Sequence, residues 1–288
     1  MVSKVGRIKV QLHRPLEGTP KTATLRRTAT GKWFVAIACA WEPDLLSPTG
    51  RAVGIDVGLR VFAMPTTGGP IPNPRFFRSE EQALAEAQRK HQLALDAHKA
   101  VRVALTQQVI DAQPDLDAQQ VWHTVSQDTG GRQAWWERQR RRQVVARVHE
   151  RIRWRRGNFT HQESRRLVNQ YDLLAGEDLS VPNLMANHWR AKSMHDAAWS
   201  QFADLPACKA AWAGRRYVAV DPAHTSQTCS RSGWRNPALT PSDRVFHRLN
   251  PARPECRLVL DRDSNAAWNI LARGRDILAL GRQCLPSG

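Results

Sequence analysis

The sequence predicts an α/β fold, because short apolar segments typical of strands alternate with longer segments of helical periodicity. Strand-like segments lie at residues 52–57, 171–176 and 215–221, and each holds several apolar side chains. Helical patterns fill residues 79–166 and 261–280. A chain of 288 residues can bury a substantial core, so it can form one large domain or two small ones.

The N-terminal part of the chain indicates a small β structure followed by a linker. Polar and apolar residues alternate at 7–14 and 22–28, and an apolar run covers 33–41, so we expect two or three antiparallel strands. Residues 30–32, with a central glycine, supply a turn before the last of them. The stretch 43–50 contains Pro, Ser and Gly and is typical of a linker.

A strand carrying Asp56 comes next, then a turn at Gly58, a second strand and a turn at residues 67–69. In the long helical segment that follows, we expect breaks near residues 113–114 and 129–131. Four apolar residues recur there at helical spacing and form one stripe: Val144, Val145, Val148 and Ile152.

The C-terminal part continues the alternation. The strand at 171–176 ends at Glu177, a polar helix is expected over 195–212, and residues 222–257 are rich in Pro and Arg and predict irregular structure. Four residues of the last helix share a face: Ala266, Ala267, Ile270 and Leu271. Because two of them are alanines, this helix can pack close to a sheet.

The composition favours a polyanionic partner. The formal net charge is +17, the pI is about 10.8, and 35 of the 43 basic residues are arginines. Arginine pairs bidentately with phosphate, so nucleic acid is favoured over a membrane surface, although a GC-rich genome also enriches arginine. No run of eighteen apolar residues and no signal-peptide pattern are present, and the five cysteines are scattered. These features indicate a reduced, cytoplasmic setting.

Three acids occupy positions where strands end or a helix begins, namely Asp56, Glu177 and Asp263. Hydrolysis of a phosphodiester by two divalent metals needs carboxylates that converge on ions about 4 Å apart. Each acid alone is a weak signal, because an Asp after a strand is usually a turn or cap residue. The flanking glycines of GIDVG keep bulky side chains away from Asp56, and we expect them to leave room for ions.

An arginine-rich stretch gives the second candidate site, because ten arginines lie between Arg132 and Arg156. They form either a solvated helix face or a surface that follows a phosphate backbone, and nearby tryptophans favour the second. The residues that we expect to contact nucleic acid are Arg138, Arg141, Arg142, Arg151, Arg155 and Arg156.

Several ordered motifs resemble the TnpB family, the transposon-encoded relatives of type V CRISPR effectors. GIDVGLRVFA is similar to the first RuvC motif, SRRLVNQYDLLAGEDLSVPNL to the second, and DRDSNAAWNIL to the third, with HERIRWRRGNF matching the arginine-rich helix. The resemblance implies an RNase H-like (RuvC) nuclease core in which Asp56, Glu177 and Asp263 bind Mg²⁺ or Mn²⁺. It also implies a guide RNA from the transposon end, a DNA target, and a bacterial or archaeal, nucleoid-associated location.

The chain departs from the family pattern in three ways. About fifty residues precede the first motif, so residues 1–50 resemble a shortened wedge-like β-barrel segment and 51–288 the nuclease domain. Residues 94–134 resemble an insertion, inside a helical insertion over about 75–166, and have no functional interpretation.

The third departure is a degenerate zinc ribbon over about 222–257, where two of the four expected cysteines are missing. Cys229 and Cys256 match ribbon ligands, but Ser232 and Arg253 replace their partners. Two thiolates make only half of a tetrahedral zinc shell, so zinc is not expected unless His224 or His247 substitutes.

Three functional hypotheses follow. The first is an RNA-guided, divalent-metal-dependent DNA endonuclease of a transposable element, either whole or truncated, which would be a phosphodiester hydrolase. The second is a nucleic-acid-binding TnpB remnant that keeps the acids without cleaving. The third is a transposase that acts directly in strand transfer. The oligomeric state stays open.

Overall fold

The computed structural model describes residues 8–178, 199–240, 242–247 and 258–281. The chain forms two compact units. The helical unit comprises Met1–Glu42 and Phe77–Arg153, and the sheet unit comprises Pro43–Phe76 and Trp154–Gly288. No helix in the described part of the chain is both long and apolar enough to cross a membrane.

The helical unit contains a two-stranded antiparallel sheet of β1 (Thr19–Arg27) and β2 (Trp33–Ala40). The expected turn between them is present, with Gly31 at φ +86°. The candidate strand at 7–14 is absent from its described part, residues 8–14, whose backbone pairs with no strand of the described chain. The hairpin is tied to a helix of its own unit through Thr30 and Lys32, whose side chains donate hydrogen bonds to Glu150 at 3.0 and 2.9 Å.

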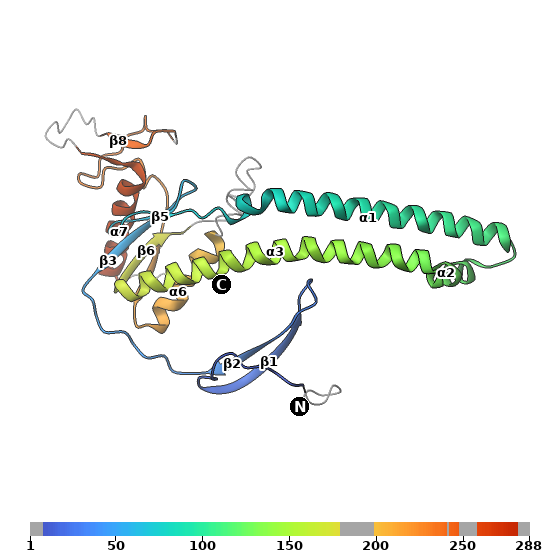
Figure 1. The fold of residues 1–288 in the computed structure, drawn as a ribbon. Coiled ribbons are helices and arrows are strands. Elements are labelled where there is room, and N and C mark those ends of the chain that lie inside the picture. The colour runs from blue at the N-terminus through green and yellow to red at the C-terminus, as the bar shows by residue number, and fades with distance from the viewer. Residues whose placement is uncertain (1–7, 179–198, 241, 248–257, 282–288) are drawn as a thin grey trace. The chain divides into compact units, whose positions relative to one another are not determined.

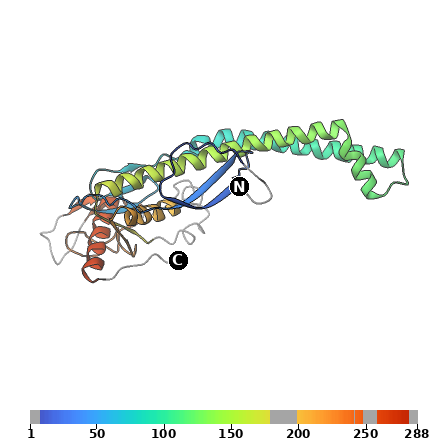
Figure 2. The ribbon, with the colours of Figure 1, turned by 90° about the horizontal axis from the view of Figure 1, so that it is seen from below.

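Three helices make up most of this unit: α1 (Phe76–Ala112), α2 (Ala118–Gln127) and α3 (Thr129–Gln170), the last of which continues into the sheet unit. Figures 1 and 2 show the long parts of α1 and α3 running side by side. The break near residues 113–114 is confirmed, and Asp117 caps α2 through a reciprocal capping box with Gln120. The second break falls at Asp128, so residues 129–131 begin α3 instead of interrupting it.

The sheet unit is built on five strands in the order β5-β4-β3-β6-β7. The strands are β3 (Ala52–Val57), β4 (Val61–Pro65), β5 (Ile71–Pro72), β6 (Leu173–Glu177) and β7 (Arg216–Val220). β3, β4 and β5 form an antiparallel meander, whereas β6 and β7 continue the sheet parallel to β3. The prediction of an α/β fold is therefore confirmed.

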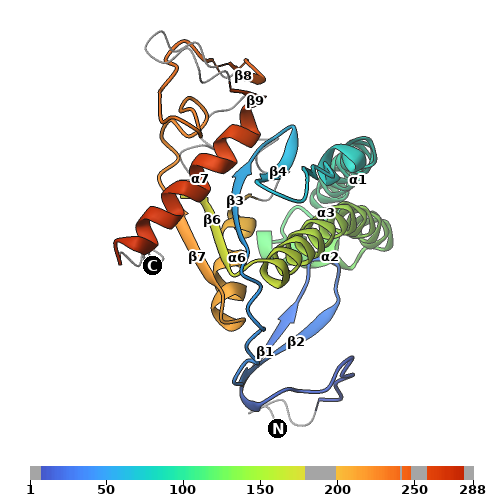
Figure 3. The same ribbon diagram turned by 90° about the vertical axis from the view of Figure 1, so that its left-hand side faces the viewer.

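Helices cover both faces of this sheet. α6 (Trp199–Trp212) and the end of α3 pack on one face, where Ile55, Phe62 and Leu174 are at most 2% exposed. α7 (Arg262–Ala279) crosses the other face (Figure 3), and its Ile270 belongs to one buried apolar cluster with Val218. Burial of these apolar side chains on two faces is the main stabilising term of the unit.

The expected close packing of the last helix is confirmed, with glycines at the contact points. Ala266 and Ala267 are at most 1% exposed. A Cβ on Gly54 of β3 would lie 2.1 Å from the carbonyl oxygen of Ala267, and a Cβ on Gly274 of α7 would lie 2.6 Å from Ala175 Cβ. Neither position has space for a side chain. Gly54 therefore allows α7 to pack closely on β3, and the expectation that the glycines of GIDVG leave room for ions stays a prediction.

Candidate acid site

Asp56 and Glu177 lie at the carboxyl ends of two neighbouring parallel strands. β3 and β6 are paired with Ile55 opposite Gly176, and the next residue of each strand is one of the two acids. Side chains alternate between the faces of a strand, and the residues two positions earlier in both strands contact α7. Both carboxylates therefore project on the face that α7 covers.

Asp263 reaches the same place from the first turn of α7. It lies one helical turn before Ala267, which touches β3, and Figure 3 shows α7 beginning near the carboxyl end of that strand. Asp261 caps the helix, because its carboxylate accepts hydrogen bonds from the N–H groups of Asp263 and Ser264 at 3.0 and 3.2 Å. The positive end of the helix dipole also favours an acid here.

The three acids interact electrostatically. Burial raises the pKa of Asp56 well above its usual value, and the charges of Glu177 and Asp263 raise it further. Burial also raises the pKa of Glu177 to about 7, with a smaller contribution from Asp263. Each carboxylate is therefore within the field of the other two, and the group favours a bound cation or a proton.

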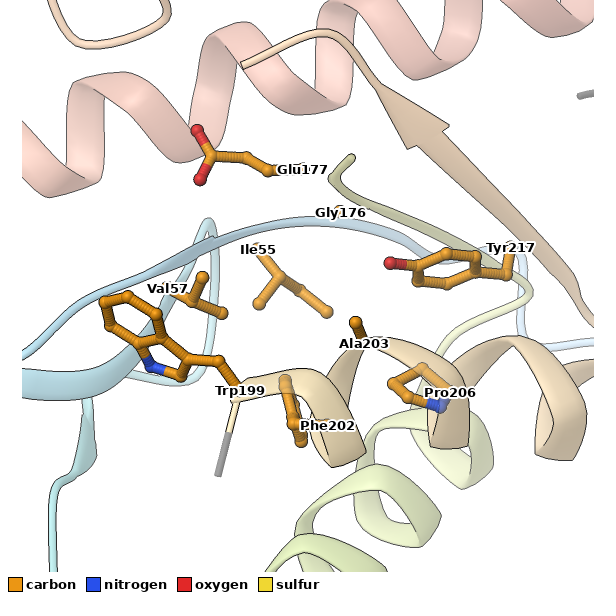
Figure 4. A pocket seen from close by; sticks show the side chains of 9 residues that line it. All are labelled: Ile55, Val57, Gly176, Glu177, Trp199, Phe202, Ala203, Pro206 and Tyr217. Carbon is orange, nitrogen blue, oxygen red and sulfur yellow. The ribbon is translucent and has the colours of Figure 1, made fainter. Parts of the chain in front are cut away.

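An apolar pocket has Glu177 among its lining residues (Figure 4). Ile55, Trp199, Phe202 and Tyr217 are among the side chains that line it, between the sheet and α6. In Figure 4 the Glu177 carboxylate lies on the side of the sheet away from Phe202 and is directed toward α7. The carboxylate therefore lies between the sheet and α7, and its burial there raises its pKa.

As they stand, the acids are neighbours and not yet a ligand shell. Among the residues that the structure describes, no three His, Cys, Asp or Glu side chains surround a common point closely enough to ligate one ion. The chemistry of the donors nevertheless suits a hard divalent cation, because all three are carboxylates and Mg²⁺ prefers oxygen ligands. Asp56, the most deeply placed, has the strongest need for a neutralising charge.

Basic residues that sequence reasoning missed stand around the acids. Arg262 forms an ion pair with Asp263 at 3.4 Å and lowers the pKa of Asp56, while Arg273 lowers the pKa of Glu177. These guanidinium groups partly offset the negative charge of the acid group. Arg262 is adjacent to Asp263 in the sequence, but nothing in the local pattern shows that its charge reaches Asp56.

A loop fastened to α7 supports Glu177 and was also missed. Thr225 donates a hydrogen bond from Oγ1 to Glu177 Oε1 at 3.1 Å. Asn269 is 8% exposed and donates to the carbonyl oxygens of Thr225 and Thr228 at 2.8 and 2.6 Å. Asn265 donates to Thr228 as well, at 2.7 Å. The sequence did contain one signal of this support: Asn265 and Asn269 are four residues apart and lie in phase with the buried face of α7.

In its described part, the ribbon segment contains no group of side chains placed to ligate a metal ion. Cys229 is 1% exposed and packs with Leu239 and Phe246, so its thiol behaves as a small apolar side chain. His224 and His247, the possible replacement ligands, have exposed side chains. The antiparallel pairing of β8 (Val245–His247) with β9 (Val259–Asp261) also holds the segment together.

Cys256 and Arg253 lie outside the described residues. The absence of zinc therefore stays a prediction.

The six candidate arginines all lie on α3, but they do not form one uniform surface. Arg142, Arg151 and Arg155 are exposed, whereas the other three are partly buried. Arg141 pairs with Glu137 at 2.6 Å, and Arg151 pairs with Glu80 at 2.9 Å. The stripe beside them is buried at Val148 and Ile152. Their contact with nucleic acid stays a prediction.

Comparison with known proteins places the chain among mobile-element proteins. A family model described as "Probable transposase" (OrfB_IS605) matches residues 37–188, and one described as "Cas12f1-like, TNB domain" matches residues 199–270. The chain is 33% identical over 280 residues to a "Putative RNA-guided DNA endonuclease" of Streptomyces pristinaespiralis. It is 24% identical over 297 residues to the "Putative RNA-guided DNA endonuclease InsQ" of Escherichia coli K12.

These relatives are longer than the chain. The alignments cover 95% and 96% of this chain but 58% and 62% of the two proteins. Among solved structures, a Cas12f1 complex with sgRNA and target DNA matches with a TM-score of 0.46 at 14% identity, covering 86% of this chain and 55% of that one. The mini-RNA-guided endonuclease CRISPR-Cas_phi3 matches with a TM-score of 0.41 at 12% identity, covering 81% and 48%. Because the first family model spans more than half of the chain, this protein belongs to the OrfB family of IS605 elements, the TnpB family.

Proposed function

We propose that the chain is part of an RNA-guided, divalent-metal-dependent DNA endonuclease of a transposable element. The observation that carries the proposal is the meeting of Asp56, Glu177 and Asp263, from three distant segments, on one face and at one edge of the sheet. In this proposal the meander of β3, β4 and β5, extended by parallel β6 and β7, is the RNase H-like (RuvC) core. The residues nearest the reaction are then the three acids.

The chemistry of the acids fits phosphodiester hydrolysis. Bound divalent ions would activate the attacking water and stabilise the leaving oxygen. Asp56, Glu177 and Asp263 would supply carboxylate ligands, and Thr225 would hold one oxygen of Glu177 through its hydrogen bond. The raised pKa values mean that the carboxyl groups exchange protons for cations as ions bind, so affinity for the ion rises with pH.

The proposed partners are a guide RNA and a DNA target. Both curated relatives carry names that describe RNA-guided DNA endonucleases. The net charge of +17 and the arginines of α3 suit two polyanionic strands. Pairing between guide and target would provide sequence specificity, and the protein would hold the duplex and position one strand at the acids.

Metal binding is tested first, because it does not depend on a correct guide. Mn²⁺ titration followed by electron paramagnetic resonance should show bound ions in the wild type, and Asp56→Asn should lose most of them. Asp276→Asn removes an exposed carboxylate of α7 and is the matched control. Equal binding by wild type and Asp56→Asn would contradict the site.

Cleavage is then measured with guide RNA, matched target DNA and Mg²⁺. Guide-dependent cuts that Asp56→Asn abolishes, with DNA affinity retained, would establish the enzyme. Ion binding without cleavage would favour the nucleic-acid-binding remnant. Joined strands in place of free ends would indicate a transposase that acts directly.

A further inference from the structure

The helical unit contains a pocket that the proposed nuclease site does not use. Its volume is about 430 Å³, within the range of about 300–1,000 Å³ typical of ligand sites. Helices α1, α2 and α3 all contribute to it, and the residues that matter here are His98, Arg102, Trp122, Arg132, Trp136 and Arg138. It lies largely within the segment 94–134, for which the sequence offered no function.

Tryptophans form the apolar part of the pocket and are unusually open to solvent. Trp122, Trp135 and Trp136 are 59%, 40% and 65% exposed. Trp135 and Trp136 pack edge to face, with ring centroids 4.6 Å apart, which restrains both rings. Burial of apolar surface stabilises a fold by roughly 25 cal/mol for each Å². Because these rings stay largely exposed, they contribute little of this stabilisation, and a ligand could bury them instead. Flat ligands such as nucleobases stack on rings of this kind.

Cations form the other part of the pocket. Arg102, Arg132 and Arg138 line it, and no described lining residue is a carboxylate. The Nε of Arg138 is buried and makes no hydrogen bond within the described part of the chain. Guanidinium groups without a competing acid can take a phosphate bidentately. The pocket is therefore complementary to an anionic ligand with a flat aromatic part.

His98 adds hydrogen-bonding capacity without charge. It is 7% exposed and lines the pocket from α1. Burial lowers its pKa, and the neighbouring Arg138 and Arg102 lower it further. The neutral imidazole offers one donor and one acceptor, which suits the polar edge of a base.

We propose that this pocket binds one unpaired nucleotide of a single-stranded nucleic acid, with the base on the tryptophans and a phosphate on the arginines. Binding here involves neither the three acids nor a metal, so the proposal stands or falls separately from the nuclease activity. RNA and DNA strands share this chemistry. The experiment uses both, because the nucleotide can belong to a guide RNA or to an unpaired DNA strand.

The first test measures binding of short labelled single-stranded RNA and DNA by fluorescence anisotropy across a salt series, with EDTA present. Trp136→Ala should weaken binding of the recognised strand by about 5- to 150-fold, the equivalent of about 1–3 kcal/mol per stacked base, with an unchanged salt slope. Arg132→Gln should instead flatten the slope by about 0.7. Trp136→Phe, which keeps a ring, should recover most of the affinity.

The matched control is Trp33→Ala, because Trp33 is also 65% exposed and lies on β2 of the same unit, outside the pocket. The far-UV circular dichroism of each variant establishes that it is folded. An equal loss in Trp33→Ala and Trp136→Ala would overturn the proposal, since any exposed tryptophan would then serve. So would unchanged affinity of Trp136→Ala for both strands.

The second test locates the base directly. Strands that carry iodouracil are cross-linked with ultraviolet light, and the modified peptides are identified by mass spectrometry. Adducts on the peptides of Trp122 or Trp136 with the RNA alone would assign the pocket to RNA, and adducts with the DNA alone would assign it to DNA. Adducts found only outside these peptides would overturn the proposal.

Discussion

Replacing Glu177 by Gln removes an ionisable group but leaves an oxygen that can accept the hydrogen bond of Thr225. The pKa of Glu177 is raised from 4.5 to about 7. Each tenfold change in proton affinity is worth about 1.4 kcal/mol, so the ionised side chain lowers the free energy of unfolding by about 3 kcal/mol at most. Without divalent ions, Glu177→Gln should therefore stabilise the protein by up to that amount above neutral pH.

The sign of the pH dependence follows from the direction of the shift. Because the pKa is higher in the folded protein, the folded state binds more protons than the unfolded chain between pH 4.5 and about 7. Stability is lost as the pH rises through this window. The difference between Glu177→Gln and wild type should be absent below pH 4.5 and complete above about pH 7.

Thermal and urea unfolding in EDTA, repeated with Mg²⁺, measure the effect. For a unit of this size, about 3 kcal/mol corresponds to roughly 6–12 °C in Tm. Mg²⁺ should raise the Tm of the wild type more than that of Glu177→Gln, because the ion binds the folded state through the acids. Asp276→Asn is the control for loss of one charge. A variant no more stable than wild type above neutral pH, or a control that gains equally, would refute the reasoning.

Three further predictions concern the loop, the arginines and zinc. Asn269→Ala should lower the free energy of unfolding by about 1–3 kcal/mol in urea, because the Thr225 carbonyl oxygen loses this hydrogen bond and the Thr228 carbonyl oxygen keeps only that of Asn265; no loss would contradict this. Replacing Arg142, Arg151 and Arg155 together by Gln should flatten the log–log salt dependence of duplex DNA binding by about two to three; an unchanged slope would mean a solvated face. Metal analysis of the purified protein should find no stoichiometric zinc, because Ser232 and Arg253 replace two of the four thiolates of a tetrahedral shell; about one zinc per chain would contradict this.

Elements with a strong period were predictable from the sequence, and elements made by pairing were not. β3, β6, β7 and α7 lie close to their expected ranges because each carries its own apolar pattern. β5, β8 and β9 have two or three residues, too few to show a period, and they exist only through hydrogen bonds to a partner strand. The grouping of the N-terminal hairpin with the helices likewise depends on contacts such as Lys32 with Glu150.

Within the acid site, sequence order indicated which acids to consider but not what supports them. Asp56, Glu177 and Asp263 stand in motifs that can be found along the chain. Thr225 and Asn269 are separated by 44 residues and are joined by a hydrogen bond that no local pattern encodes. The opposing charges of Arg262 and Arg273 depend in the same way on the folded geometry.

A substitution of Gly54 distinguishes two explanations of the GIDVG motif, namely room for ions beside Asp56 and close packing of α7 on β3. If the glycine leaves room for ions, a methyl group there should affect metal binding and leave stability nearly unchanged. The structure instead puts the added Cβ 2.1 Å from the Ala267 carbonyl oxygen and 2.8 Å from Leu271 Cβ, so α7 must move away from β3. Gly54→Ala should then destabilise the protein by about 1–3 kcal/mol, as overpacking of a close-packed interior does. Because the same shift displaces Asp263, Mn²⁺ affinity should fall as well. Gly58→Ala is the control, since its Cβ would meet only the Val61 carbonyl oxygen at 3.1 Å. If Gly54→Ala unfolds in urea at the wild-type midpoint, helix packing is not the reason for the glycine.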